Sequence, residues 1–129
     1  MVIAAERRGD TVTQLLRQVI AATEDQQSVL SSIGLTELVH GIYRARTPQM
    51  RSRRESFISE LISDVEVYPY TKETALLAGR IEGEQQEHGI TIPFGDLLIG
   101  ATALLHGYSV LTVNPRHFRL IPGLSVVRL

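Results

Sequence analysis

The chain has 129 residues, no cysteine and a formal net charge of −1, with 43% apolar and 21% charged residues. This length fits a single domain over residues 1–129, and the composition excludes a disordered chain, a disulfide-stabilised protein and a thiolate metal site. No apolar run reaches the roughly 18 residues of a membrane span, and residues 1–10 become charged too early for a secretion signal. We therefore expect a cytoplasmic protein that makes no membrane contact.

Strands and helices alternate in the first half of the chain, as judged from the spacing of apolar residues. A short apolar segment opens the chain, and a helix is expected from Thr11 to Ala22. "SVLSSIGL" predicts a buried strand that runs into a helix beginning at "TEL". Pro48 then opens an arginine-rich helix, and "VEVYPY" alternates as the next strand.

The second half of the chain repeats this alternation. Thr71 is a good N-cap for a helix that runs to about His88 and is closed by Gly89. Pro93 opens the helix "FGDLLIGATALLHG", and the strands "YSVLTVN" and "LSVVRL" follow it. Strands separated by helices of this length pair in parallel through right-handed crossovers. The predicted fold class is α/β, a single three-layer α/β/α sandwich around a mainly parallel sheet.

Three polar residues follow predicted apolar segments, namely Glu37 after "SVLSSI", Asp96 after "GITIP", and Asn114 after "YSVLTV". Ligands of parallel sheets bind outside the carboxyl ends of the strands, so these side chains are the candidates for a functional site. Each has a structural alternative. An acid in the first turn of a helix stabilises the helix dipole by about 0.3–1 kcal/mol, and an asparagine before proline is a common turn residue.

Two carboxylates near one sheet edge favour a divalent metal ion. Like charges that lie close together repel, and a hard cation removes that repulsion. Oxygen ligands without histidine or cysteine favour Mg²⁺ or Mn²⁺. Glu37 and Asp96 are the predicted metal ligands, and Asn114 joins them as a candidate catalytic residue that orients a water. Hydrolysis of a phosphodiester is the chemistry that such a site favours.

Several further polar residues are candidates for substrate or partner contacts. Arg116 and His117 lie beyond the end of the "YSVLTV" strand, where RNA phosphates could meet them, although a surface role is an equal alternative for each. Thr112 is a further candidate, since its hydroxyl could donate a hydrogen bond to a carboxylate, but a β-branched strand residue is the favoured interpretation. Five arginines fall between positions 44 and 54, and guanidinium groups match phosphate and carboxylate geometry. A solvated helix face is the alternative for this cluster, which consists of Arg44, Arg46, Arg51, Arg53 and Arg54.

Three stretches together resemble PIN-domain proteins, specifically toxins of the VapC type. They are "SSIGLTELVHGIYRA", "GITIPFGDLLIGATAL" and "GYSVLTVNPRHFRLIPGLSV", and they cover nearly the whole chain in the family's order. The resemblance implies a Mg²⁺- or Mn²⁺-dependent endoribonuclease, a cognate antitoxin that blocks its site, and a homodimer. It also implies that Glu37, Asp96 and Asn114 match site positions of the family.

The chain departs from the family pattern at two places. Family members begin with a strand that ends in an aspartate, and "MVIAAERRGD" resembles the segment after it, so that aspartate is expected just upstream of Met1. Glu6 and Asp10 lie downstream of the matching position. We expect a shortened central strand and a carboxylate cluster with one member fewer. Gly34 stands where Thr or Ser is usual, which leaves a weaker helix cap.

Two alternatives to a ribonuclease toxin stay open. The first is a catalytically impaired PIN module that keeps antitoxin and RNA binding, because the first acidic ligand is absent. The second is another metal-dependent phosphoesterase that prefers DNA or small phosphate esters. For the antitoxin, we expect a segment that lies across the arginine-bearing residues 42–62.

Overall fold

The computed structural model describes residues 1–4 and 28–128, and it contains five parallel strands and five helical segments within those residues. The strands are β1 (Val2–Ala4), β2 (Val29–Ser31), β3 (Glu66–Tyr68), β4 (Val110–Thr112) and β5 (Val126–Arg128). The helices are α2 (Ser32–Tyr43), α3 (Pro48–Asp64), α4 (Lys72–Glu87), α5 (Phe94–Leu105) and the short 3₁₀ helix η1 (Phe118–Leu120). The helix expected at Thr11–Ala22 lies outside the described residues.

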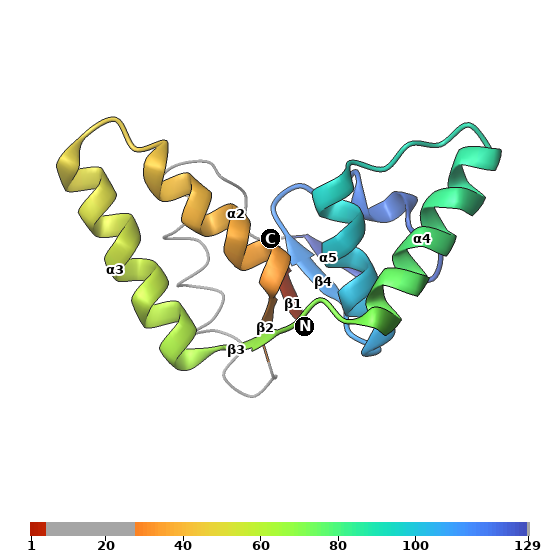
Figure 1. The fold of residues 1–129 in the computed structure, drawn as a ribbon, viewed down its shortest axis with the longest axis horizontal. Helices are drawn as coiled ribbons and strands as arrows, with labels where there is room; N and C mark the ends of the chain where they lie inside the picture. Colours follow the sequence, from red (N-terminus) through yellow and green to blue (C-terminus); the bar gives the residue numbers. More distant parts are fainter. Residues whose placement is uncertain (5–27, 129) are drawn as a thin grey trace.

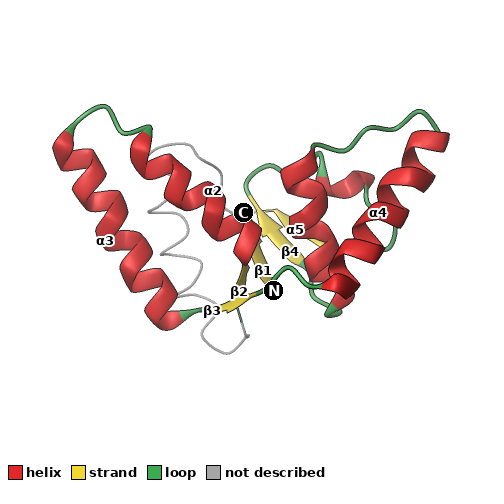
Figure 2. Cartoon of the chain, in the orientation of Figure 1, coloured by secondary structure: helices red, strands yellow, loops and turns green. Residues whose placement is uncertain are grey.

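The sheet has the order β3-β2-β1-β4-β5, and every neighbouring pair is parallel. Helices flank this sheet on both sides (Figures 1 and 2), as predicted for a three-layer α/β/α sandwich. β1 is the central strand. The chain continues from β1 to β2 and β3 on one side and then crosses over to β4 and β5 on the other side. Such a reversal of strand order is where ligands bind in open α/β sheets.

The core follows the alternation of side chains along the strands. Ile3 and Leu30 face a cluster formed with Phe57 and Leu61 of α3, whereas Val2 and Val29 face the opposite layer, where α5 packs. Successive residues of a strand point to opposite faces, so two apolar layers need strands that are apolar at every position. The short apolar strands of this sequence are therefore those of a sheet buried on both faces.

The opening segment supplies the central strand of the sheet. A shortened central strand was expected, and Val2–Ala4 forms it, pairing along its whole length with Val110–Thr112. All three residues are buried, and β1 is as long as each of the other strands. Apolar residues that fit between two buried strands stabilise this position. Glu6 and Asp10 lie outside the described residues.

The second helix begins earlier than expected. Residues 32–35 were assigned to a strand, but α2 begins at Ser32 because the Ser31 hydroxyl accepts a 2.9 Å hydrogen bond from the Gly34 N–H. Ser31, and not Gly34, is therefore the N-cap. Gly34 lies inside the helix, where a Cβ would come 3.3 Å from both Leu30 Cδ1 and Ser31 Oγ. Its small size thus allows the close approach of α2 to β2.

The helix expected over "TELVHGIYRAR" ends at Tyr43, before Ala45, and the boundaries of α3, α4 and α5 agree with the sequence. Thr47 and Thr71 cap α3 and α4 through hydrogen bonds from the N–H groups of Met50 and Thr74. Gly89 and Gly107 have positive φ angles of 74° and 70°, as expected for residues that end helices. Residues 90–93 form no strand and lead directly into α5. Within the described part of the chain, no helix is long and apolar enough to cross a bilayer.

Candidate active site at the head of α5

Asp96 is the third residue of α5 and the acid of its first turn. The residues that follow it, Leu97 to Ala103, are all buried and fix the helix against the sheet and α4. The Asp96 side chain nevertheless keeps 27% of its surface exposed. A rigid apolar helix therefore holds a partly solvated carboxylate at its positive end, where a negative charge is stabilised.

Glu37 reaches the head of α5 from the neighbouring helix α2. A Cβ built on Gly95 would collide with Glu37 Oε1, so the glutamate carboxylate lies directly against the residue before Asp96. The structure thus brings together the two acids that the sequence singled out, although 59 positions separate them. Glu37 lies in the second turn of α2 and not in the first, because the helix begins at Ser32.

Gly95 is the site residue that the sequence analysis missed. A glycine inside a helix costs about 1 kcal/mol relative to alanine, so its presence in the first turn needs a reason. The reason is steric, because only a residue without Cβ leaves room for the Glu37 carboxylate. A glycine directly before the candidate aspartate was the available signal in "PFGD".

His117 contacts the Asp96 carboxylate from the loop after β4. Its Nδ1 lies 2.9 Å from Asp96 Oδ2, and the imidazole is about one-third exposed. An ionised carboxylate only accepts hydrogen bonds, so Nδ1–H is the donor. His117 was predicted as an RNA contact; the structure adds a bond to Asp96 that the sequence did not indicate.

The other candidates after β4 differ in their exposure. Thr112 is buried, and its hydroxyl accepts a 3.0 Å hydrogen bond from the Asn114 N–H, which fixes the start of the loop. Asn114 is half-buried and Arg116 is exposed. Ala4 pairs with Thr112, so this loop begins beside the end of the central strand. The catalytic role of Asn114 and the substrate roles of Thr112 and Arg116 stay predictions.

The described residues suit a magnesium-type ion better than a closed metal site. No group of three His, Cys, Asp or Glu that could hold a metal is found among residues 1–4 and 28–128. Mg²⁺ usually keeps several waters and binds proteins through one or two carboxylates together with substrate phosphate. The Glu37 and Asp96 carboxylates at the head of α5 have the chemistry for that kind of binding.

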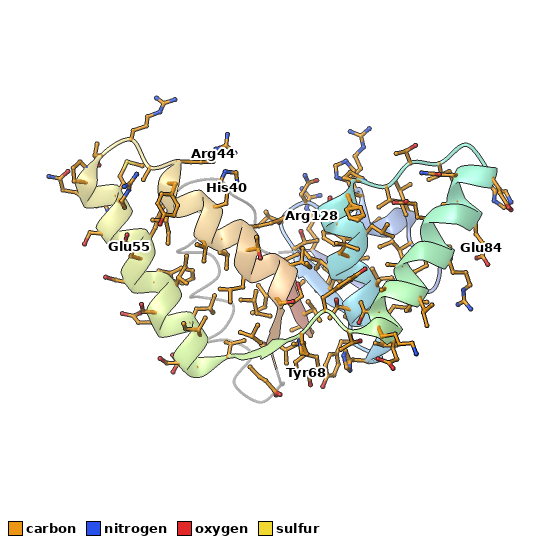
Figure 3. The ribbon with its side chains drawn as sticks, viewed as in Figure 1. His40, Arg44, Glu55, Tyr68, Glu84 and Arg128 are labelled. Atoms are coloured by element: carbon orange, nitrogen blue, oxygen red, sulfur yellow. The ribbon has the colours of Figure 1, made fainter. Side chains whose placement is uncertain are left out.

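The arginine cluster has two members with roles in the fold. Arg54 Nη1 donates a 2.6 Å hydrogen bond to the Gly41 carbonyl near the end of α2. The Arg51 guanidinium lies 5.2 Å from the centre of the Tyr43 ring, within the range of a cation–π contact. Arg44 and His40 lie at the loop end of α2, far from Tyr68 on β3 (Figure 3). Much of the cluster therefore surrounds the α2–α3 turn.

Comparison with known proteins agrees with the fold and the sequence motifs. The PIN domain model matches residues 2–124. Ribonuclease VapC1 of Rickettsia felis is 38% identical over 101 residues, which cover 78% of this chain and 75% of that protein. The tRNA(fMet)-specific endonuclease VapC of Salmonella typhimurium is 32% identical over 97 residues, or 75% of this chain and 71% of that protein.

A solved structure extends the agreement to three dimensions. DNA-bound VapBC from Salmonella typhimurium contains a chain with a TM-score of 0.75 and 28% identity, matched over 88% of this chain and 83% of that one. The family model, the sequence relatives and the architecture all agree with a PIN fold. The chain therefore belongs to the PIN domain family, among its VapC-type members.

Proposed function

We propose that this chain is a Mg²⁺- or Mn²⁺-dependent endoribonuclease toxin of a toxin–antitoxin pair. The observation that carries the proposal is the convergence of the Glu37 carboxylate and Asp96 at the head of α5, with Gly95 between them. Relatives named as VapC ribonucleases support RNA as the substrate class. The divalent metal is the proposal's own addition and rests on the oxygen-only chemistry of the two acids.

Each residue of the proposed site has a separate task. Glu37 and Asp96 would hold the ion, which supplies Lewis-acid stabilisation of phosphate charge and lowers the pKa of the attacking water. Asn114 offers an amide that orients that water by hydrogen bonding. Arg116, exposed on the same loop, binds phosphate oxygens of the RNA backbone.

A direct test compares RNA cleavage by this chain with Mn²⁺ and with EDTA. A labelled single-stranded RNA and a DNA of the same sequence are incubated with wild type and with Asp96→Asn purified in parallel. We expect metal-dependent cleavage of RNA that Asp96→Asn loses. EDTA-resistant cleavage, or equal cleavage by the variant, would contradict the proposal, and preferential cleavage of DNA would favour the phosphoesterase alternative.

One observation favours the second candidate, a PIN module that binds partners without cutting RNA. Within the described residues the site has two carboxylates, and no group of three His, Cys, Asp or Glu side chains is arranged to hold a metal. RNA binding without metal-dependent cleavage in the same assay, seen as a gel shift, would favour this alternative.

We also propose an antitoxin partner and a homodimer. VapBC complexes among solved relatives support the first, and exposed Tyr43 and Ile62 on the arginine-bearing helices offer apolar contacts. Charge reversal at Arg51 and Arg53 tests the docking surface, and Arg54 is left unchanged because it bonds to the Gly41 carbonyl. Unchanged affinity for the cognate antitoxin would contradict the proposed docking surface. The homodimer is tested separately by sedimentation equilibrium, which measures the mass of the protein in solution.

A further inference from the structure

We propose that His117 is a positioning residue that orients the Asp96 carboxylate for metal binding. This inference rests on the proposed metal site. His117 Nδ1–H donates to Asp96 Oδ2 at 2.9 Å, so one carboxylate oxygen is engaged and Oδ1 is selected as the ligand atom. Hydrogen bonds to ligating groups commonly set their orientation and tune metal affinity.

Asp96 is the third residue of α5, from where an acidic side chain can accept a hydrogen bond from the N–H of the N-cap residue. The N-cap of α5 is Pro93, which has no N–H to donate. Among the described residues, His117 is the one side chain that hydrogen-bonds to Asp96. The terminal torsion of an aspartate is broad, so a partly exposed carboxylate without this bond would sample several orientations.

His117 itself is well held, which an orienting group requires. It directly precedes η1, whose Phe118 is buried against α5. Gly100 of α5 permits the close approach of Ile121, the residue after η1, since a Cβ there would collide with Ile121 Cδ1. Gln85 of α4 donates a 2.7 Å hydrogen bond to the Leu120 carbonyl at the other end of η1. Two helices therefore fix the loop that carries His117.

Substitutions at position 117 distinguish a role of His117 as a hydrogen-bond donor from a role in filling space. His117→Asn keeps an N–H donor at nearly the position of Nδ1, whereas His117→Leu keeps bulk and removes the donor. His117→Gln carries its amide one methylene further and serves as the second donor-displaced variant where the leucine variant does not fold. His88→Leu is the matched control, because His88 Nδ1 is also 2.8 Å from an oxygen, the Glu84 carbonyl, but lies at the end of α4.

The test measures Mn²⁺ affinity by titration calorimetry on the full chain without RNA. We expect His117→Leu and His117→Gln to weaken Mn²⁺ binding about 10- to 100-fold, and His117→Asn to restore it to within about threefold of wild type. His88→Leu should leave the affinity unchanged. An unchanged Mn²⁺ affinity in His117→Leu or His117→Gln, even with a lower unfolding temperature, would show a purely structural bond and overturn the inference.

Asp96→Asn separates this inference from the function on which it rests. If wild type binds no Mn²⁺, or Asp96→Asn binds it as well as wild type, the proposed metal site and the inference both fail. If Asp96→Asn loses binding and His117→Leu does not, only the positioning role is overturned. A His117→Asn variant that binds as weakly as His117→Leu contradicts the donor role in the same way.

Discussion

At the scale of single residues, the site depends on one glycine and one histidine as much as on the two acids. Gly95 leaves the space in which the Glu37 carboxylate lies, and His117 donates a hydrogen bond to Asp96. Gly95 has no side chain to bind a ligand, and the Nδ1 of His117 is engaged with the Asp96 carboxylate. Their contribution is geometric, since each fixes where a carboxylate lies relative to the head of α5.

Gly95→Ala tests the steric part of this description. The new Cβ must displace the Glu37 carboxylate, which is the far end of a flexible side chain. Stability should therefore be unchanged or slightly higher, while RNA cleavage falls about 10- to 100-fold because the acids are misplaced. Gly83→Ala is the control, since nothing lies within 4 Å of its Cβ position, and it should add about 0.5–1 kcal/mol of stability without changing cleavage. Wild-type cleavage by Gly95→Ala would contradict the close approach.

At the scale of elements, a few side-chain hydrogen bonds join helices and strands that lie far apart in the chain. Arg54 of α3 reaches the Gly41 carbonyl of α2, and Gln85 of α4 reaches η1. Tyr68 of β3 contacts Tyr108, just before β4, through their hydroxyl groups at 3.1 Å. These bonds determine how firmly α2 and the loop after β4 bring their site residues to α5.

Arg54→Ala should loosen the α2–α3 pair. It removes a charged donor from the partly buried Gly41 carbonyl, a loss of about 1–3 kcal/mol in unfolding free energy. Arg44→Ala, at an exposed position of the same cluster, should stay within about 0.5 kcal/mol of wild type. Urea denaturation of both variants measures the difference, and equal stability would show that the Arg54 bond contributes nothing.

The hydrogen bond between Tyr68 and Tyr108 should make the stability of the fold depend on pH. The hydrogen bond that the Tyr68 hydroxyl donates to Tyr108, followed by desolvation, raises the pKa of Tyr68 from 10.0 to about 12. A group whose pKa is raised in the folded state binds its proton more tightly there, so its stabilising contribution is full below pH 10.0 and is lost as the pH rises to about 12. The urea midpoint of wild type should therefore exceed that of Tyr108→Phe at pH 9, and the gap should close towards pH 12. A gap that widens with pH would refute the assignment.

At the scale of the whole molecule, the parallel sheet places α2, α5 and the loop after β4 around the end of the central strand. Much of this could be predicted from the sequence. The apolar strands, the caps at Thr71 and Gly89, and the apolar run after Asp96 indicated a parallel three-layer fold and two of its acids. Local sequence patterns of this kind predict secondary structure and topology, because each pattern involves residues that are close together in the chain.

What the sequence did not show depends on contacts between distant segments. The Asp96–His117 bond spans 21 positions, and the approach of Glu37 to Gly95 joins two helices that are separated by α3, β3 and α4. The start of α2 was misplaced because an apolar, serine-containing run fits either a strand or a capped helix, and the Ser31 cap decides between them.

The most direct measurement is the rate of RNA cleavage as a function of Mn²⁺ concentration for wild type, Glu37→Gln and Asp96→Asn. If the two carboxylates hold the catalytic ion, the wild-type rate saturates with Mn²⁺. Each variant then loses about 100-fold or more in rate or in apparent metal affinity. A wild-type rate that is independent of Mn²⁺, or variants that follow the wild-type curve, would contradict the central claim that Glu37 and Asp96 form a metal-dependent active site.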